Sequence, residues 1–370
     1  MKFEVSSVDL KRALGVVFKG ISSKPHLPIL SGLLIRVKDG VTSITSTDLE
    51  ISFWMEVETS IKEDGEVVVP AKLFFDLVST LDEGRLNIEV SDLKMKIIAK
   101  GVDTEIVCQT ADEYPVVPTS SSKGIMIKSA DFKKKLDKVI VSSAKDDTRP
   151  ILTGILFQIK NSEITFVATD GFRLSVNTMD LKGSGVDCIE EKVIIPSRSL
   201  SELQKVISEL SAESFSIEID KHSKQVIFVF SGMEMSSRIL DGEFPPYQQI
   251  IPNTYTTKIS IEKQHLVSAV KRASLFAKES ANVIRIKVED KLLVSAENSQ
   301  IGSNVTEVEG EIDGEKINVA FNAKYLLDFL PVIESEFVEW ETEGELKPSV
   351  FRDTKDEKWL HVVMPIRTQS

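Results

Sequence analysis

Long internal repeats are the feature of this sequence that most restricts its fold. The segment PILSGLLI at 28–35 recurs as PILTGILF at 150–157, and the dipeptide Thr47-Asp48 recurs as Thr169-Asp170, in both cases 122 residues later. A spacing shared by separate segments indicates a duplicated block. A period of this length corresponds to a whole domain, because solenoid repeats are far shorter.

A fainter third copy follows the first two. Pro70, Pro196 and Asn322 each stand between a β-branched segment and a helical pattern, and they are 126 residues apart. In the third copy Asn298 occupies the place of the two Thr-Asp aspartates. Small polar residues mark the junctions, as is typical of linkers. The sequence of 370 residues therefore predicts three domains, at 1–122, 123–253 and 254–370.

Each unit shows the same order of secondary structure. A short opening strand leads into a helix, alternating strands follow, and a second helix begins after the Pro or Asn landmark. The apolar residues of the first helices have the i, i+3/i+4 spacing of one buried face: Leu10, Leu14, Val17 and Phe18; Phe132, Leu136, Val139 and Ile140; Leu266, Val270 and Ala273. We predict an α+β fold, with two helices packed on antiparallel sheets in each of three repeats.

Motifs of the common enzyme classes are absent from the sequence. It contains no phosphate-binding loop, dinucleotide-binding glycine pattern, zinc-protease motif or nucleophile elbow. We therefore predict a protein that is not an enzyme and that uses no cofactor and no metal. The two cysteines, Cys108 and Cys188, lie in unrelated contexts, and no apolar run approaches the roughly 20 residues of a membrane span. This pattern favours the reducing cytoplasm.

Asp48 and Asp170 are the strongest candidates for a catalytic acid. The alternative is that each aspartate caps a turn at a strand end, a common use of this side chain. The third copy has Asn298, which can cap a turn but cannot act as a general base. The sequence therefore favours the turn, which repeats because the domain repeats.

Charge is distributed unevenly between the predicted helices and the rest of the chain. The formal net charge is −12, which taken alone disfavours a nucleic-acid partner. The six predicted helices nevertheless carry a net charge of +7, so the remainder carries −19. These lysines and arginines either solvate exposed helix faces or form one basic surface on an acidic protein, and charge counting does not decide between the two.

The chain resembles the bacterial sliding clamp family, the beta subunits of DNA polymerase III, from its first residue to about Arg367. The segments that carry the resemblance span all three repeats: MKF at 1–3, LPIL at 27–30, TDLE at 47–50, VPAKLFFD at 69–76, VATDGFRLS at 167–175, DGEFPPY at 241–247, FNAKYLLD at 321–328 and VVMPIR at 362–367.

The resemblance implies a non-catalytic tether that keeps a DNA polymerase on its template. The family forms a head-to-tail homodimer that closes into a ring of six similar domains around double-stranded DNA, with helices lining the hole. Its clamp loader and polymerase partners bind through short peptides. Contacts directed to the phosphate backbone suit sliding, because they carry no sequence information. The alternative is a scaffold protein of the same repeated domain that does not encircle DNA.

The resemblance also implies residue roles. The DNA contacts would be Lys24, Lys72, Arg149 and Arg198, with Lys11, Arg12 and Lys133 to Lys135 as weaker candidates. The dimer interface would include Phe75, the edge strand near Ile106, Leu275 and Phe276. The partner-peptide cleft would be lined by Leu152, Thr169, Gly171, Phe172, Arg173, Leu174, Pro245, Tyr247, Ile250, Ser349, Val362, Met364 and Pro365, with Arg173 able to hold a carbonyl or carboxylate of the peptide. Phe172 stands where the family commonly has histidine, and Thr368-Gln369-Ser370 extends the usual C-terminus, so partner preference is the least transferable property.

Overall fold

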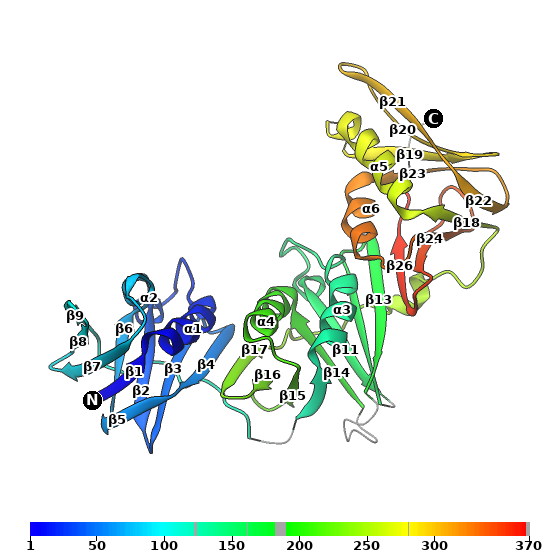
Figure 1. The fold of residues 1–370 in the computed structure, drawn as a ribbon. Helices are drawn as coiled ribbons and strands as arrows, with labels where there is room; N and C mark the ends of the chain where they lie inside the picture. The colour runs from blue at the N-terminus through cyan, green and yellow to red at the C-terminus, as the bar shows by residue number, and fades with distance from the viewer. Residues whose placement is uncertain (122–123, 161, 182–189, 280, 368–370) are drawn as a thin grey trace. The chain divides into compact units, whose positions relative to one another are not determined.

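The structure is a computed structural model that describes residues 1–121, 124–160, 162–181, 190–279 and 281–367 (Figure 1). Within these residues the chain forms six α-helices and four antiparallel sheets. Cys188 and Thr368–Ser370 lie outside the described residues. The described part contains one free cysteine, Cys108, which is buried.

The same order of elements occurs three times, as the repeats predict. The first repeat contains β1 (Lys2–Ser6), α1 (Ser7–Val17), β2 (Gly32–Lys38), β3 (Val41–Thr47), β4 (Ile51–Val57), β5 (Thr59–Glu63), β6 (Gly65–Pro70), α2 (Ala71–Thr80), β7 (Arg85–Ser91), β8 (Lys94–Ala99) and β9 (Val102–Val107). The second contains β10 (Ile125–Lys128), α3 (Ser129–Ile140), β11 (Gly154–Lys160), β12 (Glu163–Thr169), β13 (Arg173–Asp180), β14 (Glu191–Pro196), α4 (Ser197–Leu210), β15 (Ser214–Asp220), β16 (Gln225–Phe230) and β17 (Met233–Arg238). The third contains β18 (Thr257–Glu262), α5 (Lys263–Ala277), β19 (Val283–Val288), β20 (Leu292–Asn298), β21 (Gly302–Val308), β22 (Gly310–Gly314), β23 (Ile317–Asn322), α6 (Ala323–Phe329), β24 (Phe337–Thr342), β25 (Ser349–Asp353) and β26 (Asp356–Val363).

Two of the four sheets are shared between neighbouring repeats. The eight-stranded sheet has the order β10-β15-β16-β17-β4-β3-β2-β6, and the nine-stranded sheet has the order β14-β11-β12-β13-β26-β25-β24-β18-β22. The joints are the antiparallel pairs β17 with β4 and β13 with β26. The remaining sheets, β5-β1-β7-β8-β9 and β21-β20-β19-β23, belong to the first and third repeats alone.

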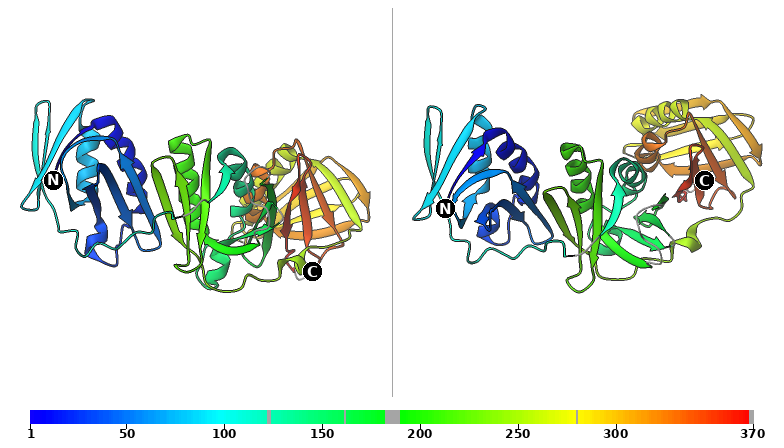
Figure 2. Two further views of the ribbon diagram at one scale, coloured as in Figure 1. Left: turned by 90° about the horizontal axis from the view of Figure 1, so that it is seen from below. Right: turned by 60° about the horizontal axis from the view of Figure 1, so that its bottom comes forward.

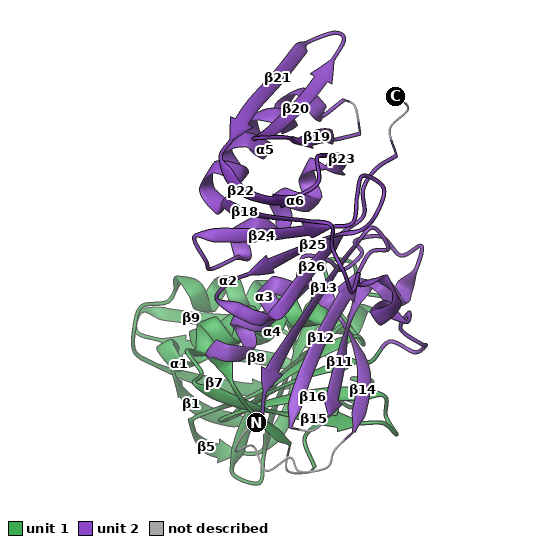
Figure 3. Ribbon diagram, turned by 90° about the vertical axis from the view of Figure 1, so that its right-hand side faces the viewer, with its two compact units in different colours: residues 1–129, 198–239 green, residues 130–197, 240–370 purple. Residues whose placement is uncertain are grey.

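Contacts divide the chain into two compact units, one of residues 1–129 and 198–239 and one of residues 130–197 and 240–370 (Figure 3). This division differs from the three sequence repeats because the central repeat is split. Its strands β15 to β17 continue a sheet of the first repeat, and its strands β11 to β14 continue a sheet of the third. Each unit is therefore one terminal repeat plus half of the central one.

The first helix of each repeat buries the face that its apolar spacing predicts. Leu10, Leu14 and Val17 of α1, Phe132, Leu136 and Val139 of α3, and Leu266, Val270 and Ala273 of α5 are buried, while Phe18 and Ile140 are half-buried. The helices of the terminal repeats lie in pairs, α1 beside α2 and α5 beside α6 (Figure 2). The amphipathic pattern thus fixes which side of each helix meets the sheets.

The second helix of each repeat begins where the landmarks predict. α2, α4 and α6 start directly after Pro70, Pro196 and Asn322. Proline cannot donate to a strand ladder, so it ends the strand. The Asn322 Oδ1 accepts a hydrogen bond from the Lys324 backbone N–H at 3.0 Å, and this bond caps the first turn of α6.

Candidate functional site

The repeated Thr-Asp segments form turns, as the sequence favours. Asp48 Oδ1 accepts the backbone N–H groups of Glu50 and Ile51 at 3.0 and 2.8 Å. Asp170 Oδ1 accepts those of Phe172 and Arg173 at 2.9 and 3.0 Å. In the third copy Asn298 Oδ1 accepts the Gln300 N–H at 2.9 Å. All three side chains therefore close an Asx turn, and the cap uses only one oxygen.

The second oxygen of each aspartate binds an arginine. Asp48 Oδ2 lies 2.6 Å from Nη2 of Arg198 on α4, and Asp170 Oδ2 lies 3.0 Å from Nε of Arg173 on β13. The turn accounts for the contacts of Oδ1 alone. The sequence did not predict the two ion pairs that Oδ2 makes. Each arginine belongs to one of two candidate functional sites.

The first candidate site is a small polar pocket of about 210 Å³ in the unit of residues 1–129 and 198–239. It brings together two of the predicted DNA contacts, Lys24 and Arg198, with Arg238, which the sequence reasoning missed. The full lining is Ser22, Lys24, Pro25, His26, Asp48, Leu49, Glu50, Arg198 and Arg238. Three cations around one small pocket can bind an anion such as a phosphate group.

The other predicted basic residues of this unit differ in their availability. Lys72 is exposed in the first turn of α2, and Arg12 is exposed on α1. Lys11 is not a free cation, because its ammonium donates to the Leu81 carbonyl that follows α2, at 2.5 Å. The hypothesis that Lys11 contacts DNA is therefore corrected: its charge caps the end of the neighbouring helix.

In the other unit, Arg149 is exposed and lies near the turn at Gly171, where a Cβ on that glycine would be 3.4 Å from Arg149 Nη1.

The lysines of α3 are less available for contacts with DNA than the sequence suggested. Lys134 pairs with Glu334 at 2.7 Å and Lys135 with Asp356 at 2.6 Å. Lys135 is 18% exposed and is held in this structural network of ion pairs, whereas Lys134 is 47% exposed, and its role as a DNA contact stays a prediction.

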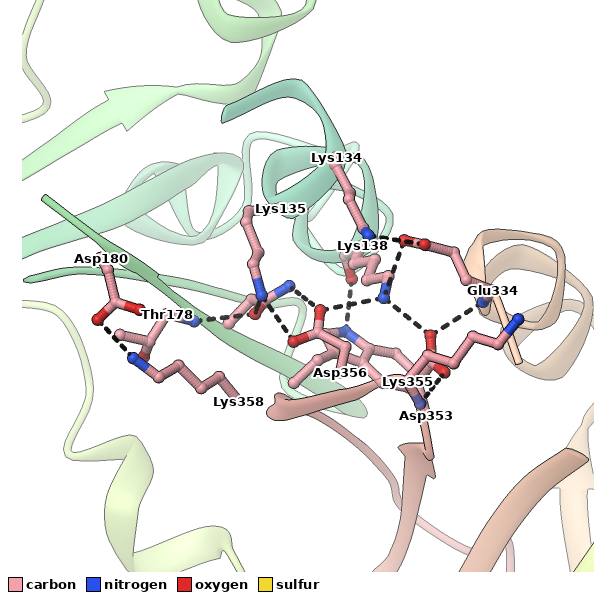
Figure 4. A network of polar contacts seen from close by, with 12 residues as sticks. Lys134, Lys135, Lys138, Thr178, Asp180, Glu334, Asp353, Lys355, Asp356 and Lys358 are labelled. Atoms are coloured by element: carbon pink, nitrogen blue, oxygen red, sulfur yellow. Dashed lines mark hydrogen bonds and ion pairs between the residues drawn. The ribbon is translucent and has the colours of Figure 1, made fainter. Parts of the chain in front are cut away.

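The centre of that network is Lys138, whose side chain is 1% exposed (Figure 4). Its Nζ lies 2.8 Å from Asp353 Oδ2 and 3.0 Å from Asp356 Oδ2, and the Trp359 indole N–H donates to its backbone carbonyl at 3.1 Å. Burial alone would lower the pKa of Lys138, but the hydrogen bonds that its ammonium donates to Asp353 and Asp356, with the charges of these two carboxylates, outweigh burial and hold its pKa above the usual value.

The network joins helix α3 of the central repeat to strands β25 and β26 of the third. Asp353 also accepts the backbone N–H groups of Glu334 and Ser335, and these bonds, together with Lys138, outweigh burial and hold its pKa well below the usual range. Sequence reasoning missed this cluster. The signal was available, because Lys138 occupies the repeat position of Val16 in α1, a buried apolar site.

The residues predicted to line the partner-peptide cleft gather around the joint of β13 and β26. The structure brings its thirteen residues into one unit but divides them by exposure. Gly171, Phe172, Pro245, Ile250, Met364 and Pro365 reach the surface, and Phe172 is 61% exposed. Leu152, Thr169, Arg173, Leu174, Tyr247, Ser349 and Val362 are buried.

Three of the seven buried members pack together beneath this region. Leu174, Tyr247 and Val362 belong to one apolar cluster, with Ile151 and Phe244 packed against it. The Met364 backbone N–H donates to the Phe172 carbonyl at 2.8 Å, which extends the β13 and β26 pairing to the cleft surface. The surface-accessible residues are therefore fewer than the sequence suggested.

Arg173 is committed to intramolecular contacts, which corrects its expected role. Besides Asp170, its guanidinium binds Asp328 of α6, with Nη1 2.7 Å from Oδ2, and it stacks 4.7 Å from the ring centre of Tyr325. The side chain is 3% exposed, so it cannot also hold a partner carbonyl or carboxylate in this arrangement.

Tyr325 and Asp328 were missed by the sequence reasoning. Tyr325 also stacks on Phe172, with ring centroids 6.4 Å apart and planes at 22°. The Phe172 ring of this aromatic pair is exposed at the surface. An exposed aromatic wall beside Met364 is suited to apolar peptide side chains.

The predicted dimer-interface residues are partly available. Leu275 is 59% exposed on α5, and Phe276 beside it is half-buried. Phe75 is half-buried on α2 and stacks on Phe18 at 4.7 Å. Ile106 is 2% exposed and belongs to the core, so its side chain is wrong as an interface contact.

The edge strand predicted near Ile106 is β9, an outer strand of its sheet. On it Val107 is 70% exposed, because successive side chains point to opposite faces of a strand. Val107 therefore replaces Ile106 as the candidate contact.

None of the helices in the described part of the chain has the length and apolar composition of a bilayer-spanning helix. No group of three or more His, Cys, Asp or Glu side chains in the same part is arranged to hold a metal ion.

Comparisons with known proteins cover the whole chain. Models of the N-terminal, central and C-terminal domains of the DNA polymerase III beta subunit match residues 1–118, 126–246 and 248–367. Proteins named beta sliding clamp from Staphylococcus aureus strain Mu50 and Bacillus subtilis strain 168 are each 30% identical over the full length of both chains. The crystal structure of the Bacillus subtilis DNA polymerase sliding clamp is 29% identical, covers all of both chains and superposes with a TM-score of 0.95. The repeats, the shared sheets and these matches together place the chain in the bacterial DNA polymerase III beta subunit family.

Proposed function

We propose that this chain is a DNA sliding clamp that works as a head-to-tail homodimer closed around double-stranded DNA. The observation that carries the proposal is an unpaired strand edge at each end of the repeat series. The family consists of beta subunits of DNA polymerase III. We propose that this chain is an accessory subunit of such a polymerase and is itself non-catalytic. We propose a cytoplasmic location, because bacterial DNA is replicated in the cytoplasm.

The two joints within the chain follow one rule. The last strand of a repeat pairs with the β4-type strand of the preceding repeat: β17 pairs with β4, and β26 pairs with β13. By this rule β9, the last strand of the first repeat, and β21, the β4-type strand of the third, are left without the pairing that joins repeats. Among the described residues both are outer strands paired on one side only, β9 with β8 and β21 with β20. Pairing of β9 with β21 of a second chain would complete a third shared sheet.

Exposed apolar residues on β21 support this pairing. Ile301, just before β21, occupies the repeat position of Ile51, which is 1% exposed where β4 pairs with β17, yet Ile301 is 53% exposed. Val305 on β21 is 66% exposed. A Cβ on Gly302 would lie 4.0 Å from the Phe276 ring, so the strand edge adjoins the apolar end of α5.

The facing surface would come from the first repeat. There β9 carries the exposed Val107, and α2 carries Leu73, which is 55% exposed, and Phe75, which stacks on Phe18. Because the two surfaces differ, the interface is heterologous, and such an interface gives a closed ring only when the rotation closes. Two copies of three repeats would provide six domains, with proposed boundaries near residues 122 and 253 in each chain.

DNA would contact the basic side chains that remain available. These are Lys24, Arg198 and Arg238 in the pocket, with Lys72, Arg12 and Arg149. The net charge of −12 would keep nucleic acid away from the other surfaces. The exposed residues of the cleft would bind short peptides of the clamp loader and polymerases.

The experiment compares retention on circular and linear DNA. The protein is loaded onto nicked circular DNA by a clamp loader with ATP, and half of the sample is then linearised. A clamp stays on the circle and slides off the linear ends, and light scattering gives the mass of a dimer. Retention that is indifferent to DNA ends would favour the alternative, a scaffold that does not encircle DNA.

A charge-reversal variant tests the DNA contacts separately. Lys24→Glu with Arg149→Glu should weaken binding to unrelated duplex sequences equally and flatten the salt dependence, because fewer counterions are released. Lys38→Glu with Lys128→Glu, two exposed strand-end lysines, is the matched control. An unchanged salt slope in the first variant would remove these residues from the DNA interface.

A further inference from the structure

We propose that Asp48 is a built-in competitor of DNA, whose carboxylate holds Arg198 in the position where a DNA phosphate would bind. This inference rests on the proposed function and concerns how tightly the pocket holds DNA. Carboxylate and phosphate oxygens are both natural acceptors for guanidinium, so one can replace the other.

The geometry assigns the two oxygens of Asp48 to different tasks. Oδ1 closes the turn, while Oδ2 lies 2.6 Å from Arg198 Nη2. The Asp48 side chain is 7% exposed and therefore fixed, whereas the Arg198 side chain is 59% exposed. An accessible cation is thus paired with a buried carboxylate at the edge of a pocket.

A second acid of the same turn has a similar position. Glu50 Oε1 lies 3.8 Å from Arg238 Nη1, and both side chains are more than half exposed. Lys24 lines the same pocket. Two of the three cations of the pocket are thus partly neutralised by the turn at 48–50, and a phosphate competes with these carboxylates for them.

The third repeat provides the internal comparison. There Asn298 closes the same turn through Oδ1 and offers an amide nitrogen in place of the second carboxylate oxygen. The turn therefore needs one oxygen only, and the negative charge of Asp48 has a separate role. A low affinity of the pocket for each DNA phosphate suits a protein that must move along DNA, because tightly bound phosphates would slow each step.

The test is Asp48→Asn in the full-length dimer. The substitution keeps Oδ1 for the turn, as Asn298 does, and removes the charge that holds Arg198. We expect duplex affinity at low salt to rise about two- to fivefold, the size of a surface ion pair. The salt dependence should steepen by about one counterion, because Arg198 becomes free for a phosphate. Fluorescence anisotropy of a labelled duplex at several salt concentrations measures both.

Two further variants isolate the cause. Asp39→Asn makes the same change of charge at an exposed turn whose φ of 53° suits asparagine, and it should leave affinity unchanged. In a protein that already carries Arg198→Ala, adding Asp48→Asn should not raise duplex affinity, because the cation that Asp48 would release is missing. Glu50→Gln is a second test that leaves the turn cap untouched, and it should give a smaller gain through Arg238.

The possible outcomes separate this inference from the proposed function. If Asp48→Asn and Glu50→Gln bind DNA no more tightly than Asp39→Asn does, the competitor role is overturned, while retention of the unmodified protein on circular DNA still supports the clamp. If the gain persists without Arg198, it comes from general charge and the inference is also overturned. If the unmodified protein is not retained on circles, both proposals are wrong.

Discussion

Arg173 and Asp328 form an ion pair that joins strand β13 of the central repeat to helix α6 of the third, with Nη1 2.7 Å from Oδ2. The same guanidinium binds Asp170 and lies over Tyr325, which stacks on the exposed Phe172. One buried cation therefore positions the aromatic wall of the proposed cleft.

Asp328→Asn should weaken the binding of a peptide from the C-terminus of the replicative polymerase several-fold. The guanidinium would lose one of its two carboxylates, and the Phe172 and Tyr325 pair would lose its support. The free energy of unfolding should fall by about 1 kcal/mol, since Asp328 is partly exposed. Calorimetry with the peptide measures the affinity.

The matched control is Asp76→Asn. Asp76 occupies the repeat position of Asp328 in α2 and is exposed. It should leave peptide affinity unchanged. Equal affinities in the two variants would show that Arg173 does not shape the cleft.

Lys138→Ala should lower the free energy of unfolding by about 3–5 kcal/mol, because Asp353 and Asp356 would remain buried without their cation. The shift of the urea midpoint measures the effect. Lys134→Ala should cost less than about 1 kcal/mol, since its pair with Glu334 is exposed to solvent.

A compensating variant tests the cause of the Lys138 effect. Lys138→Met with Asp353→Asn and Asp356→Asn should recover part of the loss, because no unpaired charge is left buried. If this triple variant is less stable than Lys138→Ala alone, lost hydrogen bonds rather than unpaired charge dominate the network.

Stability should fall as pH drops below about 6.5, through His361. Burial, with a smaller contribution from Arg173, holds the pKa of His361 well below its usual value, so the folded protein keeps it neutral. The unfolded chain binds a proton near pH 6.5 that the folded chain excludes. The stabilising contribution is therefore complete above that pH and is lost as the pH falls.

The expected slope is at most about 1.4 kcal/mol per pH unit from this group. Urea unfolding at pH 5 to 7.5 measures it. His361→Gln should reduce the slope, while His222→Gln, at an exposed site, should not. A slope that is identical in all three proteins would exclude His361 as its source.

Leu275→Asp with Phe276→Asp should give a folded monomer. The two carboxylates would lie in the proposed contact between α5, β21 and the partner's first repeat, where burial without a counter-ion is costly. Sedimentation at low micromolar concentration measures the mass. Leu346→Asp, at a residue that is 60% exposed in the loop between β24 and β25, should remain a dimer. A double variant that is still dimeric would place the interface elsewhere.

The sequence alone determined the repeats and most of the local structure. Periodicity predicted the buried face of each first helix, and Pro70, Pro196 and Asn322 predicted where each second helix begins, because these signals act within a few residues. Asn298 in the third copy was enough to favour a turn over catalysis, since a cap needs one oxygen and a general base needs a carboxylate.

Only the tertiary structure decided which side chains are available for function. The sequence predicted free cations at Lys11, Lys135 and Arg173. In the structure each of them contacts a group that is at least 70 residues away along the chain. Ile106 and Val107 are neighbours of similar character, and strand pairing alone turns one inward and the other outward. Ion pairs and strand registers depend on contacts distant in sequence, and local patterns do not encode them.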